Sequence, residues 1–362
     1  MTVREIAELA GVSIGTVDRV LYKRGRVSEA TRAKIERIIE RYQWTTNPLA
    51  RSLKRAKPYT FCTVLPRRNQ DAGYWACIIE GIKDGEAVVS PLGIQTTILE
   101  YDRYNRSSFN EAARQIIDSK PDGLIIPPIM PEMTLPFIAR AEEAGIPYVF
   151  VDADMPGLSP RCAIAQNPYS GGCLAGRLMH LFISTSEAES GVRRGAAVAV
   201  LDAHGEDYHI RKRRDGFVAY AAEHGMTVVV EEYSGYRGTE LPKTRVEHFL
   251  RVNAGLAGIF VTNAMAHRVV EVVQALRAKS SCIADDLCII GYDLVPANRA
   301  RLQQNMVAAI ICQRPEEQGK QAVLSLYRAV VLEQRISEKI EIPINVYLKE
   351  NIPPENSFRQ PF

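Results

Sequence analysis

The chain has 362 residues, of which 46% are hydrophobic and 24% are charged, a composition typical of a globular protein with two or three domains. No apolar run approaches the roughly 20 residues of a membrane-spanning helix, so we expect no membrane span. The seven cysteines are scattered and never fall in C-x-x-C spacing, which argues against zinc sites and disulfides. The amino terminus lacks the apolar segment of a signal peptide, so we expect a cytoplasmic protein.

Positive charge is concentrated at the amino-terminal end of the chain. Residues 1–56 contain twelve arginines and lysines and six acidic residues, a net charge of +6. The whole chain carries only +3, so the remaining 306 residues carry −3. A basic excess on a small module at one end of a chain is typical of a surface that binds nucleic-acid phosphates.

Residues 1–46 have the pattern of three short helices. Thr2 and Glu5 form the sequence of a capping box and predict the start of the first helix. Gly11 ends this helix, Ser13 caps a second one, and Ser28 caps a third. The residues expected in the core of this module are Ile6, Leu9, Ala10, Val12, Val17, Val20, Leu21, Ile35, Ile38, Ile39 and Tyr42. A glycine turn between two short helices is the helix-turn-helix pattern, and a helical bundle with a solvated charged face is the alternative.

The sequence REIAELAGVSIGTVDRVL, the RVSEATR that follows it and the later NPLARSL resemble the DNA-binding head of the lactose/galactose (LacI-type) repressor family. The resemblance implies that the second helix lies in the major groove, where Arg19 can donate two hydrogen bonds to a guanine and Ile14 can contact a thymine methyl. Gly15 offers no side chain to the bases, and Asp18 departs from the family's usual serine. Pairing of Asp18 with Lys23 or Arg19, and a hydrogen bond from a cytosine amino group, are both open alternatives.

A possible hinge follows this module, because Asn47-Pro48 has the pattern of a helix start. Residues 48–53 are too few for a helix that is stable alone. In the resembled family this helix forms on DNA and a leucine at the position of Leu53 opens the minor groove, whereas the alternative is an ordinary linker helix. The residues expected to contact DNA are Thr2, Ser13, Ile14, Gly15, Thr16, Arg19, Asn47, Ala50 and Leu53.

From residue 59 onward, strand-like segments alternate with amphipathic helical segments, which predicts two α/β subdomains with parallel sheets. The expected strands are 60–65, 94–99, 123–126, 148–151, 196–201, 228–232, 258–261, 287–291 and 307–311. The expected helices are 74–89, 107–119, 132–144, 171–182, 212–223, 245–252 and 264–278. GYWACIIEGI, DGLIIPP, QNPYSGGCLAGRLM, FVTN, IIGYD and ICQRPEEQGKQA resemble the periplasmic-binding-protein-like (type I) fold that the repressor family carries behind its head.

The expected fold is therefore a small all-α helix-turn-helix headpiece with a hinge helix, followed by an α/β two-subdomain periplasmic-binding-protein-like fold. The predicted boundaries are 1–46 for the headpiece, 47–58 for the hinge helix and linker, and 59–362 for the ligand-binding and dimerisation domain. Within the last domain, one subdomain is expected from 59–164 with 314–333, and the other from 165–313 with 334–362.

Ligands of open α/β sheets bind beyond the carboxyl ends of the strands, so we expect a ligand between the two subdomains. Tyr74 and Trp75 can stack on a sugar, although packing into the core is the alternative for one of them. The resemblance adds polar side chains at the family's ligand positions: Asn167, Arg213, Asn263, Asp293 and Gln313. A buried Arg213–Asp293 ion pair across the cleft would need further hydrogen bonds, which sugar hydroxyls can supply.

Nothing in the sequence assembles into a catalytic or metal-binding motif, and His209 is expected on a solvent loop, with the cleft as the alternative. We expect a ligand-controlled transcriptional regulator, a repressor in the family's usual sense, without cofactor or metal. A homodimer on a palindromic operator is expected from the head. A sugar is the expected effector, with a sugar acid held by Arg213 or a nucleoside as alternatives. A solute-binding protein without a DNA role and a sugar-modifying enzyme are the rival functions.

Overall fold

The computed structural model describes residues 1–21, 25–42, 57–185, 196–202, 205, 207–233, 242–279 and 283–354. The chain divides into two compact units, Met1–Arg55 and Ala56–Phe362. Three of the predicted DNA contacts, Asn47, Ala50 and Leu53, lie outside the described residues. Among the helices that are described, none has the length and apolar character needed to cross a membrane.

The described part of the small unit consists of the predicted helices α1 (Val3–Ala10), α2 (Ile14–Leu21) and α3 (Glu29–Arg41). The hydroxyl of Thr2 accepts the Glu5 N–H, and the Glu5 carboxylate accepts the Thr2 N–H at 2.7 Å, which is the predicted capping box. Gly11 ends α1 with a φ of 66°, a left-handed conformation that favours glycine. Local sequence signals therefore position α1 and the turn that leads into α2.

The core of the small unit is apolar and consists of Ile6, Ala7, Ala10, Val17, Val20 and Ile35. Two of the predicted core residues are wrong, because the side chains of Leu9 and Tyr42 are 51% and 52% exposed. Ile6, Ala7 and Ala10 form the buried stripe of α1, and Leu9 falls to the side of this stripe at 100° of rotation per residue.

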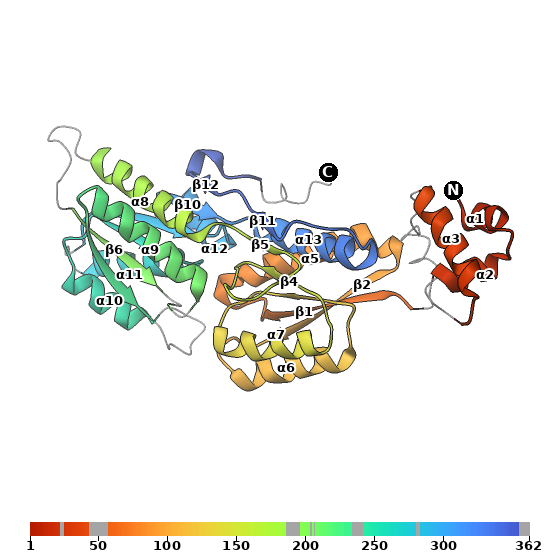
Figure 1. The fold of residues 1–362 in the computed structure, drawn as a ribbon. Coiled ribbons are helices and arrows are strands. Elements are labelled where there is room, and N and C mark those ends of the chain that lie inside the picture. The colour runs from red at the N-terminus through yellow and green to blue at the C-terminus, as the bar shows by residue number, and fades with distance from the viewer. Residues whose placement is uncertain are drawn as a thin grey trace. The chain divides into compact units, whose positions relative to one another are not determined.

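The large unit has two lobes, each built on a sheet with helices on both faces (Figure 1). The first sheet has the strand order β11-β5-β4-β3-β1-β2, and the second has the order β12-β10-β9-β8-β6-β7. The ten strands β1 to β10 thus repeat one arrangement twice, and in the described part of the chain they pair with one another in parallel. Because helices cover both faces of these sheets, the parallel strands have mostly apolar sequences without polar alternation, as in YTFCTVLP of β1.

The first lobe contains the strands β1 (Tyr59–Pro66), β2 (Ile94–Tyr101), β3 (Gly123–Ile126), β4 (Tyr148–Val151), β5 (Ala163–Ala165) and β11 (Lys339–Glu341). The second contains β6 (Ala197–Asp202), β7 (Thr227–Glu232), β8 (Gly258–Val261), β9 (Cys288–Tyr292), β10 (Ala309–Cys312) and β12 (Asn345–Tyr347). All nine predicted strands are confirmed to within a few residues. The sequence missed β5, β11 and β12, because three residues are too few for a periodic signal.

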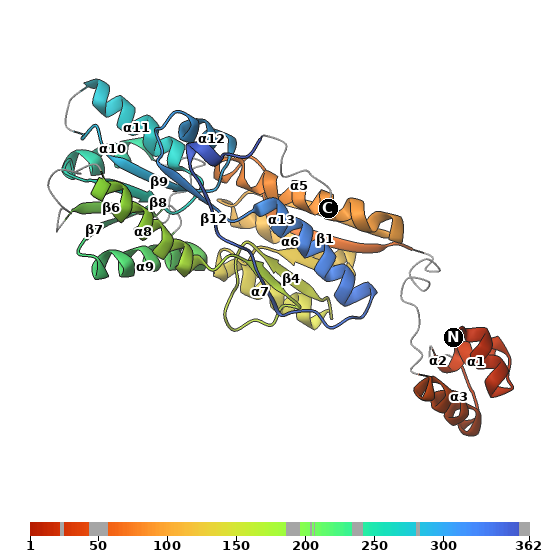
Figure 2. The ribbon, with the colours of Figure 1, turned by 90° about the horizontal axis from the view of Figure 1, so that it is seen from above.

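In the first lobe, α5 (Tyr74–Val89) and α13 (Pro315–Leu326) cover one face of the sheet, and α6 (Arg106–Ser119) and α7 (Pro131–Glu143) cover the other (Figures 1 and 2). In the second lobe, α8 (Pro168–Thr185) and α9 (Tyr208–Glu223) cover one face, and α10 (Lys243–Val252), α11 (Ala266–Lys279) and α12 (Pro296–Gln303) cover the other. The seven predicted helices are confirmed, whereas α12 and α13 were not predicted.

One predicted boundary between the lobes is wrong. The chain passes to the second lobe after β5, returns after β10, and passes again between β11 and β12. Lys339–Glu341 pairs with Ala163–Ala165 in the first sheet, so the last passage lies at residues 342–344 and not at 334. β11 pairs with the outer edge of β5. Without β11, the backbone N–H and C=O groups on this edge of β5 would have no strand to pair with.

The helices α5 and α13 lie side by side, so close that the contact leaves no room for a Cβ atom at Gly81 (Figure 2). A Cβ atom on Gly81 of α5 would lie 2.0 Å from the carbonyl oxygen of Glu316 in α13. The obstacle is backbone, which cannot rotate away as a side chain can. Since α13 connects β10 of the second lobe to the first lobe, this contact also positions the connection between the lobes.

We predict that Gly81→Ala lowers the free energy of unfolding by about 1–3 kcal/mol, the usual cost of an overpacked core. The control is Gly255→Ala, because a Cβ atom at Gly255 meets no atom within 4 Å. Urea unfolding followed by circular dichroism measures both variants. Equal stability of the two variants would show that α5 and α13 can separate without cost.

Candidate ligand-binding cleft and DNA-binding face

The predicted base-reading residues lie on one exposed face of α2. The side chain of Ile14 is 53% exposed, and Gly15 and Arg19 are also exposed. Residues 14, 15 and 19 fall within about 140° of the helix circumference, so they can face one groove together. A Cβ atom on Gly15 would lie 4.0 Å from the Arg19 guanidinium, an ordinary van der Waals distance, so Gly15 and Arg19 are neighbours on this face.

The other predicted contacts of the head take part in caps. Ser13 accepts the Thr16 N–H at 3.2 Å, and the two hydroxyls lie 2.9 Å apart, so both residues begin α2. Thr2 belongs to the capping box of α1. Asp18 is exposed, and no ion pair joins it to Arg19 within the described head, whereas Lys23 lies outside the described residues.

Buried polar side chains of both lobes line a cavity of about 30 Å³ in the cleft of the large unit. The first lobe contributes Asp71, Tyr74, Trp75, Arg103 and Asp152. The second lobe contributes Asp207, His209, Arg213, Asn263, Asp293 and Gln313. Because all of these side chains are buried, a ligand reaches the cavity when the lobes move apart.

Several lining residues follow directly on strands, as expected for a parallel sheet. Asp152 follows β4, Asp293 follows β9 and Gln313 follows β10. Asp71, Asp152 and Asp293 have left-handed φ angles of 49°, 74° and 60°. Non-glycine residues in this region are uncommon, and such strain gathers at ligand sites, although aspartate tolerates it better than most residues.

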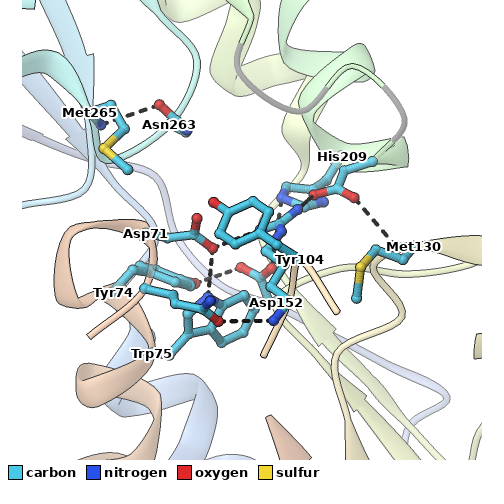
Figure 3. A network of polar contacts seen from close by, with 12 residues as sticks. Asp71, Tyr74, Trp75, Tyr104, Met130, Asp152, His209, Asn263 and Met265 are labelled. Carbon is cyan, nitrogen blue, oxygen red and sulfur yellow. Dashed lines mark hydrogen bonds and ion pairs between the residues drawn. The ribbon is translucent and has the colours of Figure 1, made fainter. Parts of the chain in front are cut away.

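The aromatic pair Tyr74 and Trp75 begins α5 and is buried in the wall of the cavity (Figure 3). Their rings meet edge to face with centroids 5.2 Å apart. The Tyr74 hydroxyl donates to Asp152 Oδ1 at 2.5 Å, and Trp75 Nε1 donates to Asp71 Oδ2 at 2.7 Å. Both rings are therefore held in place by carboxylates and belong to the core and to the cavity wall at once.

Arg213 of α9 is held from three sides within the second lobe. Its Nη1 donates to the Thr262 carbonyl at 3.0 Å, its Nη2 donates to Gln313 Oε1 at 2.8 Å, and its guanidinium lies 3.8 Å from the ring centroid of Tyr292. Gln313 Nε2 in turn donates to Asp293 Oδ2 at 3.2 Å. Gln313 thus connects the guanidinium to the carboxylate.

Two features differ from the sequence expectation. Arg213 and Asp293 both belong to the second lobe and form no direct ion pair, because Gln313 lies between them. Asn167 is not part of the cavity wall, since its Oδ1 accepts the Ser170 N–H at 3.1 Å and caps the start of α8. β5 ends at Ala165 and α8 begins at Pro168, so Asn167 falls on the capping position.

Sequence reasoning missed four charged residues of the cavity, Asp71, Arg103, Asp152 and Asp207, whereas the cleft was the alternative position for His209. His209 lies in the first turn of α9 and is buried, so the expected solvent loop is wrong. Asp152 directly follows a predicted strand, which is a signal that sequence analysis can use. The positions of Asp71, Arg103 and Asp207 depend on which loops meet, and only the fold decides that.

Four buried polar atoms of the cavity have no hydrogen-bond partner within the protein: His209 Nδ1, Arg213 Nε, Asn263 Nδ2 and Asp293 Oδ1. Two of them are donors and one is a carboxylate acceptor, so a ligand that both donates and accepts can satisfy them. An unpaired polar atom in a protein interior costs roughly 1–3 kcal/mol, which makes such a ligand favourable. Hydroxyl groups both donate and accept.

Burial and the positive charge of Arg213 have opposite effects on the pKa of Asp293. Burial raises the pKa of Asp293 to about 7, and the attraction of Arg213 only partly opposes this rise. Burial also lowers the pKa of His209, with Asp152 Oδ2 3.7 Å from its Nε2 acting in the other direction. At neutral pH, His209 is therefore mainly uncharged, and Asp293 is close to its midpoint.

The sequence of residues 2–47 matches the family "Bacterial regulatory proteins, lacI family", and residues 63–334 match the family "Periplasmic binding protein domain". The second match covers more than half of the chain. The chain therefore belongs to the periplasmic-binding-protein domain family and carries at its amino-terminal end the DNA-binding domain of the LacI family of bacterial regulators. Its two described units correspond to the DNA-binding head and the periplasmic-binding-protein-like ligand domain of that family.

Two curated LacI-family relatives match nearly the whole chain. The ribose operon repressor of Lactococcus lactis is 25% identical over 97% of this chain and 98% of that protein. The regulator DegA of Bacillus subtilis is 26% identical over 98% of this chain and 99% of that protein.

Solved structures resemble the ligand domain. A putative LacI transcriptional regulator from Bacteroides fragilis has a TM-score of 0.71 and 25% identity, over 82% of this chain and 98% of that chain. GanP, a glucose-galactose binding protein from Geobacillus stearothermophilus, has a TM-score of 0.69 over 82% of this chain and all of that chain. The identity to GanP is 22%, so this likeness shows the fold alone.

We predict that Asp293→Asn changes how the stability of this LacI-family protein depends on pH. Between about pH 4 and 7, folded Asp293 holds a proton that the unfolded chain has lost, so its contribution to stability is lost as the pH rises through 7. The variant has no titratable group at this position. As the pH rises from 4 to 7, its free energy of unfolding should therefore increase relative to that of the native protein by up to about 4 kcal/mol, at about 1.4 kcal/mol per pKa unit. Urea unfolding of the ligand-free proteins at several pH values measures this, and parallel stability curves would contradict it.

Proposed function

We propose that this protein is a transcriptional repressor that binds its operator as a homodimer and is controlled by a neutral sugar bound between the lobes of its ligand domain. The observation that carries the sugar assignment is the set of unpartnered buried atoms in the cavity: His209 Nδ1, Arg213 Nε, Asn263 Nδ2 and Asp293 Oδ1. The family membership and the exposed face of α2 carry the assignment to DNA.

The chemistry of the cavity favours hydroxyl groups over acidic groups. Its wall contains four aspartates, Asp71, Asp152, Asp207 and Asp293, but only two arginines. Both guanidiniums already bind groups of the protein, Arg103 to carboxylates and Arg213 to Thr262 and Gln313. A sugar acid would bring a further negative charge to these carboxylates, and of the two guanidiniums only that of Arg213 has an N–H, at Nε, left without a protein partner and able to donate to it. The alternative of a sugar acid held by Arg213 is therefore disfavoured.

The name of one relative agrees with a sugar effector. The Lactococcus lactis relative is named for ribose. Tyr74 and Trp75 offer apolar ring surface at the cavity wall, and sugars commonly place a C–H face on aromatic rings. We therefore propose a monosaccharide as the effector class of this protein.

The proposed control uses the two lobes as a two-state element. A sugar that contacts both lobes favours the closed arrangement by as much as its affinity for the closed state exceeds that for the open state. β1 of the first lobe begins at Tyr59, directly after the linker, so the first lobe is joined in sequence to the head. In a homodimer, rotation of the lobes would change the separation of the two linkers and with it the fit to two operator half-sites.

The rival enzyme function is not proposed, because the curated relatives named above are transcriptional regulators. We propose that the protein binds its sugar without converting it and acts in the cytoplasm, where its DNA target lies. A palindromic operator follows from the symmetry of a homodimer.

We predict that Arg19→Ala lowers the affinity for the operator by about 1–3 kcal/mol and relaxes the preference at one base pair of each half-site. The control is Arg37→Ala, an exposed arginine of α3 whose Nε bonds the Ala33 carbonyl. Mobility-shift titrations use the DNA upstream of the gene of this protein and single-base variants of it. A loss that is equal for all sequences would show that Arg19 contacts only phosphate, and binding without any preference would contradict the repressor function.

A thermal-shift screen tests the effector class. We predict that one or more neutral monosaccharides stabilise the protein by about 2.7 kcal/mol at 100 times the dissociation constant. The matching uronic or aldonic acids should have no effect, because the cavity carries an excess of carboxylates. Asn263→Ala should weaken the response, whereas Asn110→Ala, on the exposed surface of α6, should not. Stabilisation by acids alone would overturn the assignment to neutral sugars.

A further inference from the structure

The buried guanidinium of Arg103 joins the two lobes of the ligand domain. Arg103 lies on the loop after β2 in the first lobe. Its Nη1 donates to Asp71 Oδ2 of the same lobe at 2.7 Å, and its Nη2 donates to the Asp207 carboxylate of the second lobe. The side chains of Arg103 and Asp207 are 5% and 1% exposed, so this ion pair is shielded from solvent.

Asp207 is turned away from its own helix. It occupies the capping position of α9, where an aspartate usually accepts a backbone N–H of the first helical turn, but its side chain makes no such bond. One of its oxygens binds Arg103, and the other accepts the Met130 N–H of the first lobe at 3.4 Å (Figure 3). Both oxygens of this second-lobe carboxylate are thus bound by the first lobe.

A second contact between the lobes is made by His209, two residues after Asp207. His209 Nε2 is 3.7 Å from Asp152 Oδ2, and the other oxygen of Asp152 accepts the Tyr74 hydroxyl. This distance is too long for a hydrogen bond, so it contributes less than the pair of Arg103 and Asp207. The fork of a guanidinium is well suited to bridge two carboxylates, Asp71 on its own lobe and Asp207 on the other.

We propose that Arg103 and Asp207 form a latch that favours closure of the two lobes before any effector binds. Separation of the lobes breaks the ion pair and the Met130 hydrogen bond, whereas the pair of Arg103 and Asp71 moves with the first lobe. The latch therefore sets the population of open and closed protein on which an effector acts. Its consequence for DNA rests on the proposed control of operator binding by lobe closure, but the latch itself does not.

The test uses the full-length protein without added sugar. Trp75 lines the cavity and is 1% exposed, and Trp44→Phe leaves it as the only tryptophan of the chain. In this background, Asp207→Asn keeps the shape of the side chain and removes its charge. We expect acrylamide quenching of Trp75 to rise about twofold or more and the radius of gyration from small-angle X-ray scattering to increase, as the open population grows.

The matched control is Asp202→Asn. Asp202 is also buried and also pairs with an arginine, Arg214 at 3.3 Å, but both belong to the second lobe. This variant should lose stability without a change in Trp75 quenching or radius of gyration. Arg103→Lys is a second test variant, because lysine keeps the charge but cannot bridge two carboxylates with one planar group. Circular dichroism establishes that each variant is folded.

Unchanged quenching and radius of gyration in folded Asp207→Asn and Arg103→Lys protein would overturn the latch. A change of the same size in Asp202→Asn would also overturn it, since the effect would then come from general loss of stability. Titration of the upstream DNA fragment separates the latch from the proposed function. If the latch controls DNA binding, Asp207→Asn changes operator affinity in the absence of sugar. If the native protein shows no specific DNA binding, the proposed function fails, while the scattering and quenching results still decide on the latch.

Discussion

A charge buried between the two lobes must be paired, because an isolated ion in a protein interior costs several kcal/mol. This constraint explains most of the contacts in the cleft. Arg103 pairs with Asp71 and Asp207, and Gln313 connects Arg213 to Asp293. Four polar atoms of the cavity have no hydrogen-bond partner within the protein, and burial raises the pKa of Asp293 to about 7. The cleft is thus stable enough to fold but leaves hydrogen-bonding capacity that a hydroxyl-bearing ligand can use.

The repeated strand order explains how these side chains meet. Each lobe has its first strand, β1 or β6, beside its third, so residues that follow the strands converge at the carboxyl edge of each sheet. The connections after β5, after β10 and before β12 run between the lobes, and the close packing of α5 on α13 anchors one of them. A ligand that binds residues following β4, β8, β9 and β10 therefore acts on the relative position of two rigid bodies.

Much of the fold was predictable because its signals are local. The capping box at Thr2, the glycine end of α1 at Gly11 and the apolar runs of the central strands each depend on neighbouring residues. The predictions that were wrong or missing depend instead on contacts between residues far apart in the sequence. Leu9 was assigned to the core, yet the position of α3 and α2 around α1 leaves it exposed. β11 is three residues long and exists only because the edge of β5 pairs with it, Lys339 with Ala163, 176 residues earlier.

By itself, the sequence determined the helix-turn-helix head and the alternation of strands and helices, because these depend on periodicity and on chain neighbours. The polar residues Asn263, Asp293 and Gln313, which lie one or two residues beyond strand ends, came from the resemblance to the repressor family. Only the tertiary structure decided that Asn167 caps α8, that Gln313 separates Arg213 from Asp293, and that Arg103 meets Asp207 across the cleft. The last pair is 104 residues apart, and its contact depends on how two lobes close, which no local pattern encodes.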